Sequence, residues 1–165
     1  MKAIVYTSNT GHTAEYAHIL GRQTGLPVYA LSQAAKELPK GTPIVYMGWL
    51  FASYVKGYAK AAKRFEIKAV CAVGLCDTGA LLAEVRKAIS LPAETPLFTL
   101  QGGMDHSKLR GINKFMISML LKMLQKNQNP TEDDQRMLEL VKNGGYFVDP
   151  VHTESFMQWY RELDK

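Results

Sequence analysis

The chain has 165 residues, of which 47% are hydrophobic and 21% are charged, as expected for one globular domain with a substantial core. Its composition excludes a disordered chain, and its two cysteines, Cys71 and Cys76, exclude a disulfide framework or a four-ligand zinc site. The formal net charge of +5 arises entirely within residues 107–126, which hold five basic residues and no acid, so we expect no nucleic-acid partner.

The cysteine content favours a reducing compartment. No apolar stretch reaches the ~20 residues needed to cross a bilayer. The apolar run at the N-terminus is too short for a signal peptide and lacks a cleavage pattern. We therefore expect a cytoplasmic protein.

Short apolar runs that alternate with helical patterns predict an α/β fold. Strands are expected at residues 2–7, 28–31, 44–48, 68–74 and 96–100, because each run is apolar throughout, as in buried parallel strands. Helices are expected at residues 13–24, 54–65 and 78–89. The alternation predicts one doubly wound domain over residues 1–165.

The alternation changes after the fifth strand. Helical patterns cover residues 107–125 and 132–142 with no strand between them, and a last helix is expected at 153–163. Thr131 is the expected N-cap of the second of these helices. Either residues 105–145 are an insertion before the final helix, or the sheet carries more helices than usual. We expect an added helical element in both cases.

The loop between the first strand and the first helix carries the clearest chemical signal. Its hydroxyl groups and backbone amides lead into a helix N-terminus, which binds phosphate without cationic side chains. Gly11 allows a close approach of the backbone or a positive φ. The loop lacks the lysine of a Walker loop and the glycines of a dinucleotide fingerprint. An ordinary N-cap, with Glu15 in the first turn, is the alternative.

This loop, Ser-Asn-Thr-Gly-His-Thr, resembles the T/S-x-T-G-x-T phosphate loop of the flavodoxin family. The resemblance covers nearly the whole chain in its order of strands and helices. It implies a flavodoxin-like, doubly wound, five-stranded parallel sheet in the order 2-1-3-4-5, with FMN bound non-covalently at the strand ends. The implied phosphate-binding residues are Ser8, Asn9, Thr10, Gly11, His12 and Thr13.

In such proteins two further loops flank the flavin, and the resemblance maps them onto the segments after the third and fourth strands. They comprise Trp49, Leu50, Phe51 and Ala52, and Leu75, Cys76, Asp77, Thr78 and Gly79. Trp49 and Phe51 would provide an aromatic surface for the isoalloxazine ring, with core packing as the alternative for each. Asp77 has the alternative role of a helix cap, and Cys76 that of a packed thiol.

The segment 105–124 is both basic and apolar. Six apolar side chains share one helical face, and four more widen the apolar surface beyond a single stripe. One interpretation is a helix buried on two sides, with methionine filling gaps. The other is an amphipathic, cation-rich helix over residues 107–126 that rests on a membrane surface or forms a docking surface.

The same segment resembles a branch of the flavodoxin superfamily, the quinone-dependent protoporphyrinogen oxidases. The matching residues are Phe115-Met116-Ile117, Lys122-Met123, Asp149 and Phe156. The branch implies electron transfer through FMN from a hydrophobic tetrapyrrole to a quinone, at the inner face of the membrane. No motif assigns a catalytic acid or base, and we expect no metal site. Flavin chemistry resides in the cofactor, which the protein binds and orients.

Two alternatives to this enzyme remain. One is a flavodoxin that carries electrons between redox partner proteins without a substrate of its own. The basic charge opposes this alternative, because such carriers are typically acidic. The other is a flavodoxin-fold interaction module that has lost FMN, which the intact loop at residues 8–13 opposes.

Overall fold

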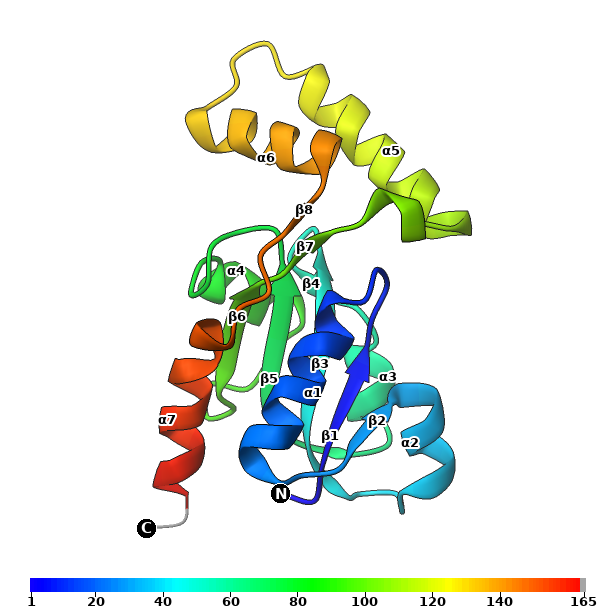
Figure 1. Cartoon of the computed structure of the whole chain (residues 1–165), viewed down its shortest axis with the longest axis vertical. Helices are drawn as coiled ribbons and strands as arrows, with labels where there is room; N and C mark the ends of the chain where they lie inside the picture. Colours follow the sequence, from blue (N-terminus) through cyan, green and yellow to red (C-terminus); the bar gives the residue numbers. More distant parts are fainter. Residues whose placement is uncertain (164–165) are drawn as a thin grey trace.

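The computed structural model describes residues 1–163 and contains a five-stranded, all-parallel sheet in the order β2-β1-β3-β5-β6 (Figure 1). The strands are β1 (Ala3–Thr7), β2 (Val28–Ala30), β3 (Pro43–Phe51), β5 (Glu66–Gly74) and β6 (Leu97–Gln101). Counted along the chain, this is the flavodoxin-like order 2-1-3-4-5. The predicted α/β fold and strand order are confirmed.

Helices cover both faces of the sheet, which explains why the strands are apolar throughout. On one face, α1 (His12–Thr24) and α7 (Glu154–Glu162) pack on Ile4, Val45 and Met47. On the other, α2 (Leu31–Glu37), α3 (Tyr58–Ala62) and α4 (Leu82–Ala88) pack on Val5 and Tyr46. Consecutive residues of β1 therefore point into two different cores.

Two predicted helices begin later than expected, because residues with positive φ lie directly before them. Residues 54–57 are not helical: Tyr54–Val55 form β4, which pairs with the end of β3, and Gly57 at φ +82° precedes α3. Residues 78–81 form turns, with Leu81 at φ +60°. The sequence patterns also missed α2, which follows β2 directly.

The predicted helical element is an insertion between β6 and α7, carried on a small antiparallel ribbon of β7 (Gly103–Met104) and β8 (Gly145–Tyr146). The ribbon leads through a single 3₁₀ turn, η1 (His106–Lys108), to α5 (Gly111–Gln125) and α6 (Glu132–Asn143). We call α5 and α6 the helical arm. Figure 1 shows the arm beyond the carboxyl ends of the sheet strands. A second 3₁₀ turn, η2 (Pro150–Thr153), precedes α7.

The arm has a small apolar core of its own, separate from the two cores on the sheet. Leu109 and Val141 are buried there, and Ile117, Leu120 and Leu124 pack against them. The start of α6 is fixed by a capping box, as expected from its Thr131: the Thr131 hydroxyl accepts a bond from the Asp134 backbone N–H, and the Asp134 carboxylate accepts one from the Thr131 N–H.

Candidate functional site

The loop at residues 8–13 presents free backbone donors at the start of α1. Gly11 is the N-cap at φ +106°, a conformation that only glycine adopts at little cost. No side chain caps the helix, and Ser8 Oγ instead accepts a bond from the Gly11 N–H at 3.2 Å. The first intrahelical bond runs from Glu15 N to Gly11 O, so the N–H groups of residues 12–14 have no intrahelical acceptor. The alternative of an ordinary side-chain N-cap is therefore wrong.

Two buried threonines lie where the loop meets a cavity. Thr13 is only 2% exposed and lines this cavity. Thr10, also buried, shares a hydrogen bond of 3.0 Å between its Oγ1 and His12 Nδ1. Both threonines line the cavity beside the start of α1, where a ligand would meet their hydroxyl groups.

His12 is neutral near pH 7. Burial lowers the pKa of its imidazole below the usual 6.5, and Lys108 lowers it further, against the opposing effect of Glu15 and Asp105. A neutral imidazole leaves the positive potential at the loop to the helix dipole and to Lys108.

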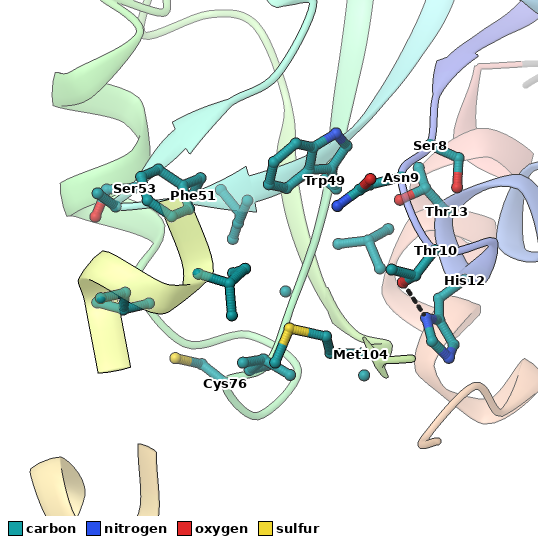
Figure 2. A pocket seen from close by; sticks show the side chains of 18 of the residues that line it. Ser8, Asn9, Thr10, His12, Thr13, Trp49, Phe51, Ser53, Cys76 and Met104 are labelled. Atoms are coloured by element: carbon teal, nitrogen blue, oxygen red, sulfur yellow. Dashed lines mark hydrogen bonds between the residues drawn. The ribbon is translucent and has the colours of Figure 1, made fainter. Parts of the chain in front are cut away.

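A cavity of about 240 Å³ opens beside the loop, at the carboxyl ends of the strands. This is where open α/β sheets bind ligands. In Figure 2, Trp49 and Phe51 lie on one side of it, Cys76 and Met104 on the opposite side, and Thr10 and His12 at one end. The cavity therefore has a polar end at the loop and mostly apolar walls.

The wall formed by β3 is aromatic. Trp49 and Phe51 are two residues apart on a strand, so both point to the same side, with ring centroids 6.3 Å apart in an edge contact. Lys56 Nζ lies 5.6 Å from the first ring and 5.5 Å from the second. Both rings are only half-buried, so the alternative of plain core packing does not describe them. They belong to β3 rather than to the loop that was expected after it.

The β3 strand ends in a tight hairpin that holds these rings. Leu50 pairs with Val55, and Phe51 with Tyr54. The two turn residues, Ala52 and Ser53, have φ of +46° and +65°, which matches the twist of a two-residue hairpin turn. Leu50 and Ala52 also line the cavity.

The loop after β5 contributes only its first two residues to the cavity. Leu75 and Cys76 line it. The other three residues bond elsewhere: Thr78 Oγ accepts from Gln101 N at 3.0 Å, Gly79 N donates to Thr99 O at 3.0 Å, and Asp77 pairs with Arg136.

Asp77 holds the helical arm rather than a helix start. Its two carboxylate oxygens accept bonds of 3.0 and 2.8 Å from the guanidinium of Arg136 on α6. A second link joins α5 to the loop, from Asn113 Nδ2 to Asn9 Oδ1 at 2.9 Å. The Asp77–Arg136 pair is exposed and modest in energy, whereas the Asn113–Asn9 bond is partly buried. Together they hold the arm over the cavity.

Cys76 is a packed thiol. Burial raises its pKa, and the nearby carboxylates of Asp77 and Asp133 raise it further, while Arg136 opposes them. The thiol therefore stays protonated at neutral pH, and reactive cysteines are thiolates. Of the two roles considered for Cys76, a packed thiol and a residue beside the flavin, the raised pKa favours the packed thiol.

Sequence patterns did not single out nine of the cavity residues. They are Ser53, Val73, Gly74, Leu81, Gly103, Met104, Ile117, Leu120 and Met137. Gly103 and Met104 follow the last sheet strand, so the rule that ligands bind at strand ends points to them. The arm residues Ile117, Leu120 and Met137 carry no such signal, because their position depends on how the arm folds back.

α5 is buried on one side only, so the interpretation of a helix buried on two sides is wrong. Ile112, Phe115, Met119 and Met123 form a stripe on which each side chain is between 57% and 74% exposed. We call these four residues the exposed stripe. The residues of α5 that pack on the arm core are Ile117, Leu120, Leu121 and Leu124.

No protein-family model, curated protein or solved structure matches the chain. No cluster of three or more His, Cys, Asp or Glu side chains that could hold a metal ion occurs among residues 1–163. None of the described helices is long and apolar enough to pass through a bilayer.

Proposed function

We propose that the protein binds FMN and works as a redox protein. The observation that carries this proposal is the set of backbone N–H groups at residues 12–14 that have no intrahelical acceptor, at one end of an apolar, aromatic cavity. A phosphate ester would accept from these donors, and a flat ring system would fit the apolar part. The residues present therefore fit FMN. When bound, FMN would supply electron or hydride transfer.

The residues of the chain would then bind the cofactor and exclude water. The loop at residues 8–13 donates to the phosphate through backbone N–H groups and the Thr13 hydroxyl. Trp49 on β3 and Leu75 in the loop after β5 provide apolar surface for the ring. Ile117 and Leu120 of α5 cover the cavity from the side of the arm, so the ring would be shielded from solvent.

We further propose an oxidoreductase of the protoporphyrinogen-oxidase type, acting on a small hydrophobic substrate or a quinone. The apolar side chains of the arm at the cavity favour such a substrate over protein-to-protein electron transfer. A non-enzymatic electron carrier with a redox partner protein is the second candidate. The half-exposed rings of Trp49 and Phe51 favour it, because they leave a route for electrons to the surface.

The exposed stripe of α5 supports a peripheral contact between the protein and the cytoplasmic face of a membrane. Its four apolar residues lie on a helix whose segment, residues 107–126, has five cations and no acid. Such a helix binds anionic lipid through buried apolar area and charge together. Lys114→Glu with Lys122→Glu should abolish sedimentation with vesicles that contain anionic lipid.

The matched control for this experiment reverses two lysines away from the arm. Lys60 and Lys63 lie at the C-terminal end of α3 and are exposed. Changing both to Glu alters the net charge by the same amount as the double change in α5. Sedimentation should persist in this control and fall with added salt in the wild type. Equal loss in both double variants would show that total charge, rather than α5, drives binding.

The proposed cofactor is tested by titrating flavin-free protein with FMN, riboflavin and FAD while following flavin fluorescence. Tight quenching of FMN with weak binding of riboflavin is the expected result. Thr13→Val should lower FMN affinity about tenfold, the usual effect of one hydrogen bond to a charged group. Thr24→Val, at the other end of α1, is the matched control and should leave affinity unchanged. Absence of quenching by all three flavins would refute the proposal.

A further inference from the structure

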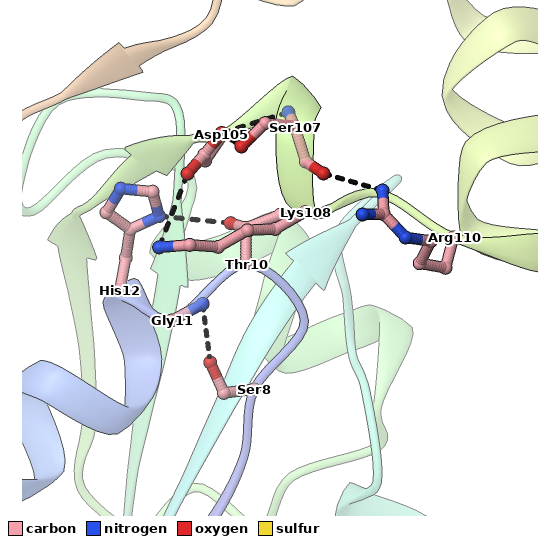
Figure 3. Close-up of polar contacts among 8 residues, drawn as sticks. All are labelled: Ser8, Thr10, Gly11, His12, Asp105, Ser107, Lys108 and Arg110. Atoms are coloured by element: carbon pink, nitrogen blue, oxygen red, sulfur yellow. Dashed lines mark hydrogen bonds and ion pairs between the residues drawn. The ribbon is translucent and has the colours of Figure 1, made fainter.

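The insertion places one cation directly over the loop at residues 8–13. Lys108 is the last residue of η1, and its Nζ lies 3.8 Å from the point where a Cβ on Gly11 would stand. Figure 3 shows its side chain extended across the loop towards Gly11 and His12. The two residues are far apart in sequence, so only the folding of the insertion brings them together.

The turn that carries Lys108 is braced. Asp105 Oδ1 accepts bonds from the Ser107 N–H at 2.9 Å and from its hydroxyl at 2.6 Å. Arg110 Nη1 donates to the carbonyls of Ser107 and Leu109 at 2.6 and 2.9 Å. The conformation of the turn around Lys108 is therefore held by contacts that do not involve its ammonium group.

The Lys108 ammonium group is free to exchange partners. Within residues 1–163 its one ion pair is with Asp105 Oδ2 at 3.3 Å, and its side chain is 61% exposed. Such an exposed pair contributes little to stability. Asp105 would keep both bonds from Ser107 if Lys108 moved to a stronger anion, so the exchange would leave no carboxylate unpartnered.

We infer that Lys108 is a binding residue for the phosphate of the flavin nucleotide, and that the insertion thereby makes the site specific for the phosphorylated flavin. This inference rests on the proposed function. The loop itself supplies neutral donors, and His12 is uncharged, so Lys108 is the cation in position to neutralise a dianion there. The insertion then contributes a charged side chain to the cofactor site.

The test compares FMN with riboflavin, which lacks the phosphate, in the Lys108→Met variant. FMN affinity should fall about tenfold, as for loss of one charge-assisted bond at an exposed site, while riboflavin affinity stays constant. Lys126→Met, at the far end of α5, is the matched control and should change neither affinity. The dependence of FMN affinity on salt should become shallower in Lys108→Met, because one phosphate–cation contact is removed.

A second variant removes the competing partner. Asp105→Asn keeps an oxygen acceptor for Ser107 but releases Lys108, so FMN affinity should rise severalfold, and riboflavin affinity should not. Adding Lys108→Met to Asp105→Asn should abolish that gain.

The inference is overturned if Lys108→Met keeps the wild-type ratio of FMN to riboflavin affinity, or if it weakens both flavins equally, which would show a structural role alone. In either case the flavin proposal stands, because the wild type still binds FMN. A wild type that binds neither flavin overturns both.

Discussion

Replacing Gly11 with Ala tests whether the proposed phosphate binding depends on the backbone shape of the loop at residues 8–13. Gly11 has φ +106° and ψ −29°, and Gly25 at the other end of α1 has φ +72° and ψ 3°. A left-handed conformation costs an L-residue roughly 1–2 kcal/mol. The lower entropy of the unfolded chain returns about 0.4–1 kcal/mol. We therefore expect each glycine-to-alanine change to reduce the free energy of unfolding by about 1 kcal/mol, measured by urea denaturation.

Steric clash does not complicate this comparison. A Cβ at Gly11 would meet only Lys108 Nζ, at 3.8 Å, which is ordinary van der Waals contact, and a Cβ at Gly25 would meet nothing within 4 Å. The two variants therefore differ in location rather than in crowding. A loop that relaxes to relieve φ at residue 11 would misdirect the N–H groups of residues 12–14.

The two variants should separate in a flavin titration. We expect Gly11→Ala to weaken FMN about tenfold, equivalent to 1.4 kcal/mol. Its effect on riboflavin should be smaller, and Gly25→Ala should leave both affinities unchanged. Equal weakening of FMN by both variants would refute the reasoning, since it would trace the effect to general stability. An unchanged FMN affinity in Gly11→Ala would show that the loop geometry is dispensable.

Two further predictions concern titrating side chains of α1. Because burial lowers the pKa of His12, the unfolded chain binds a proton near pH 6.5 before the folded chain does. The free energy of unfolding of the wild type relative to His12→Gln should thus fall as the pH drops from about 7.5 to about 5, and a constant difference would contradict this. Tyr16→Phe should cost about 1–3 kcal/mol in urea unfolding, because the buried hydroxyl donates to Gln101 O at 2.6 Å. Burial also raises the pKa of Tyr16 to about 12, so the unfolded chain loses this proton first and the fold is destabilised between pH 10 and about 12. Over that range Tyr16→Phe should lose less stability than the wild type.

Local patterns were sufficient wherever neighbouring residues decide the structure. The strands are continuous apolar runs of the length that buried parallel strands need, and the helices between them follow the helical period. The capping box of α6 joins Thr131 to a residue three positions later. The loop at residues 8–13 could be placed at the end of β1 because the strand before it and the helix after it are each evident from sequence.

The sequence patterns failed where the signal was weak or ambiguous. Ala52 and Ser53 adopt positive φ in the β3–β4 hairpin, although neither is a glycine or an asparagine, so the turn could not be read from their types. α5 is apolar on more than one side, so periodicity alone could not choose which face is buried. Packing against Met137 and Val141 of α6 made that choice.

The sequence by itself therefore determined the sheet, its strand order through the resemblance, and the position of the loop at residues 8–13. Only the tertiary structure decided that Asp77 pairs with Arg136, that Lys108 lies over Gly11, and that the arm covers the cavity. The physical reason is range. Helix periods, caps and strand runs are set by residues within a few positions of one another. These contacts instead join segments that are distant in sequence and meet only when the sheet has formed and the insertion has folded back.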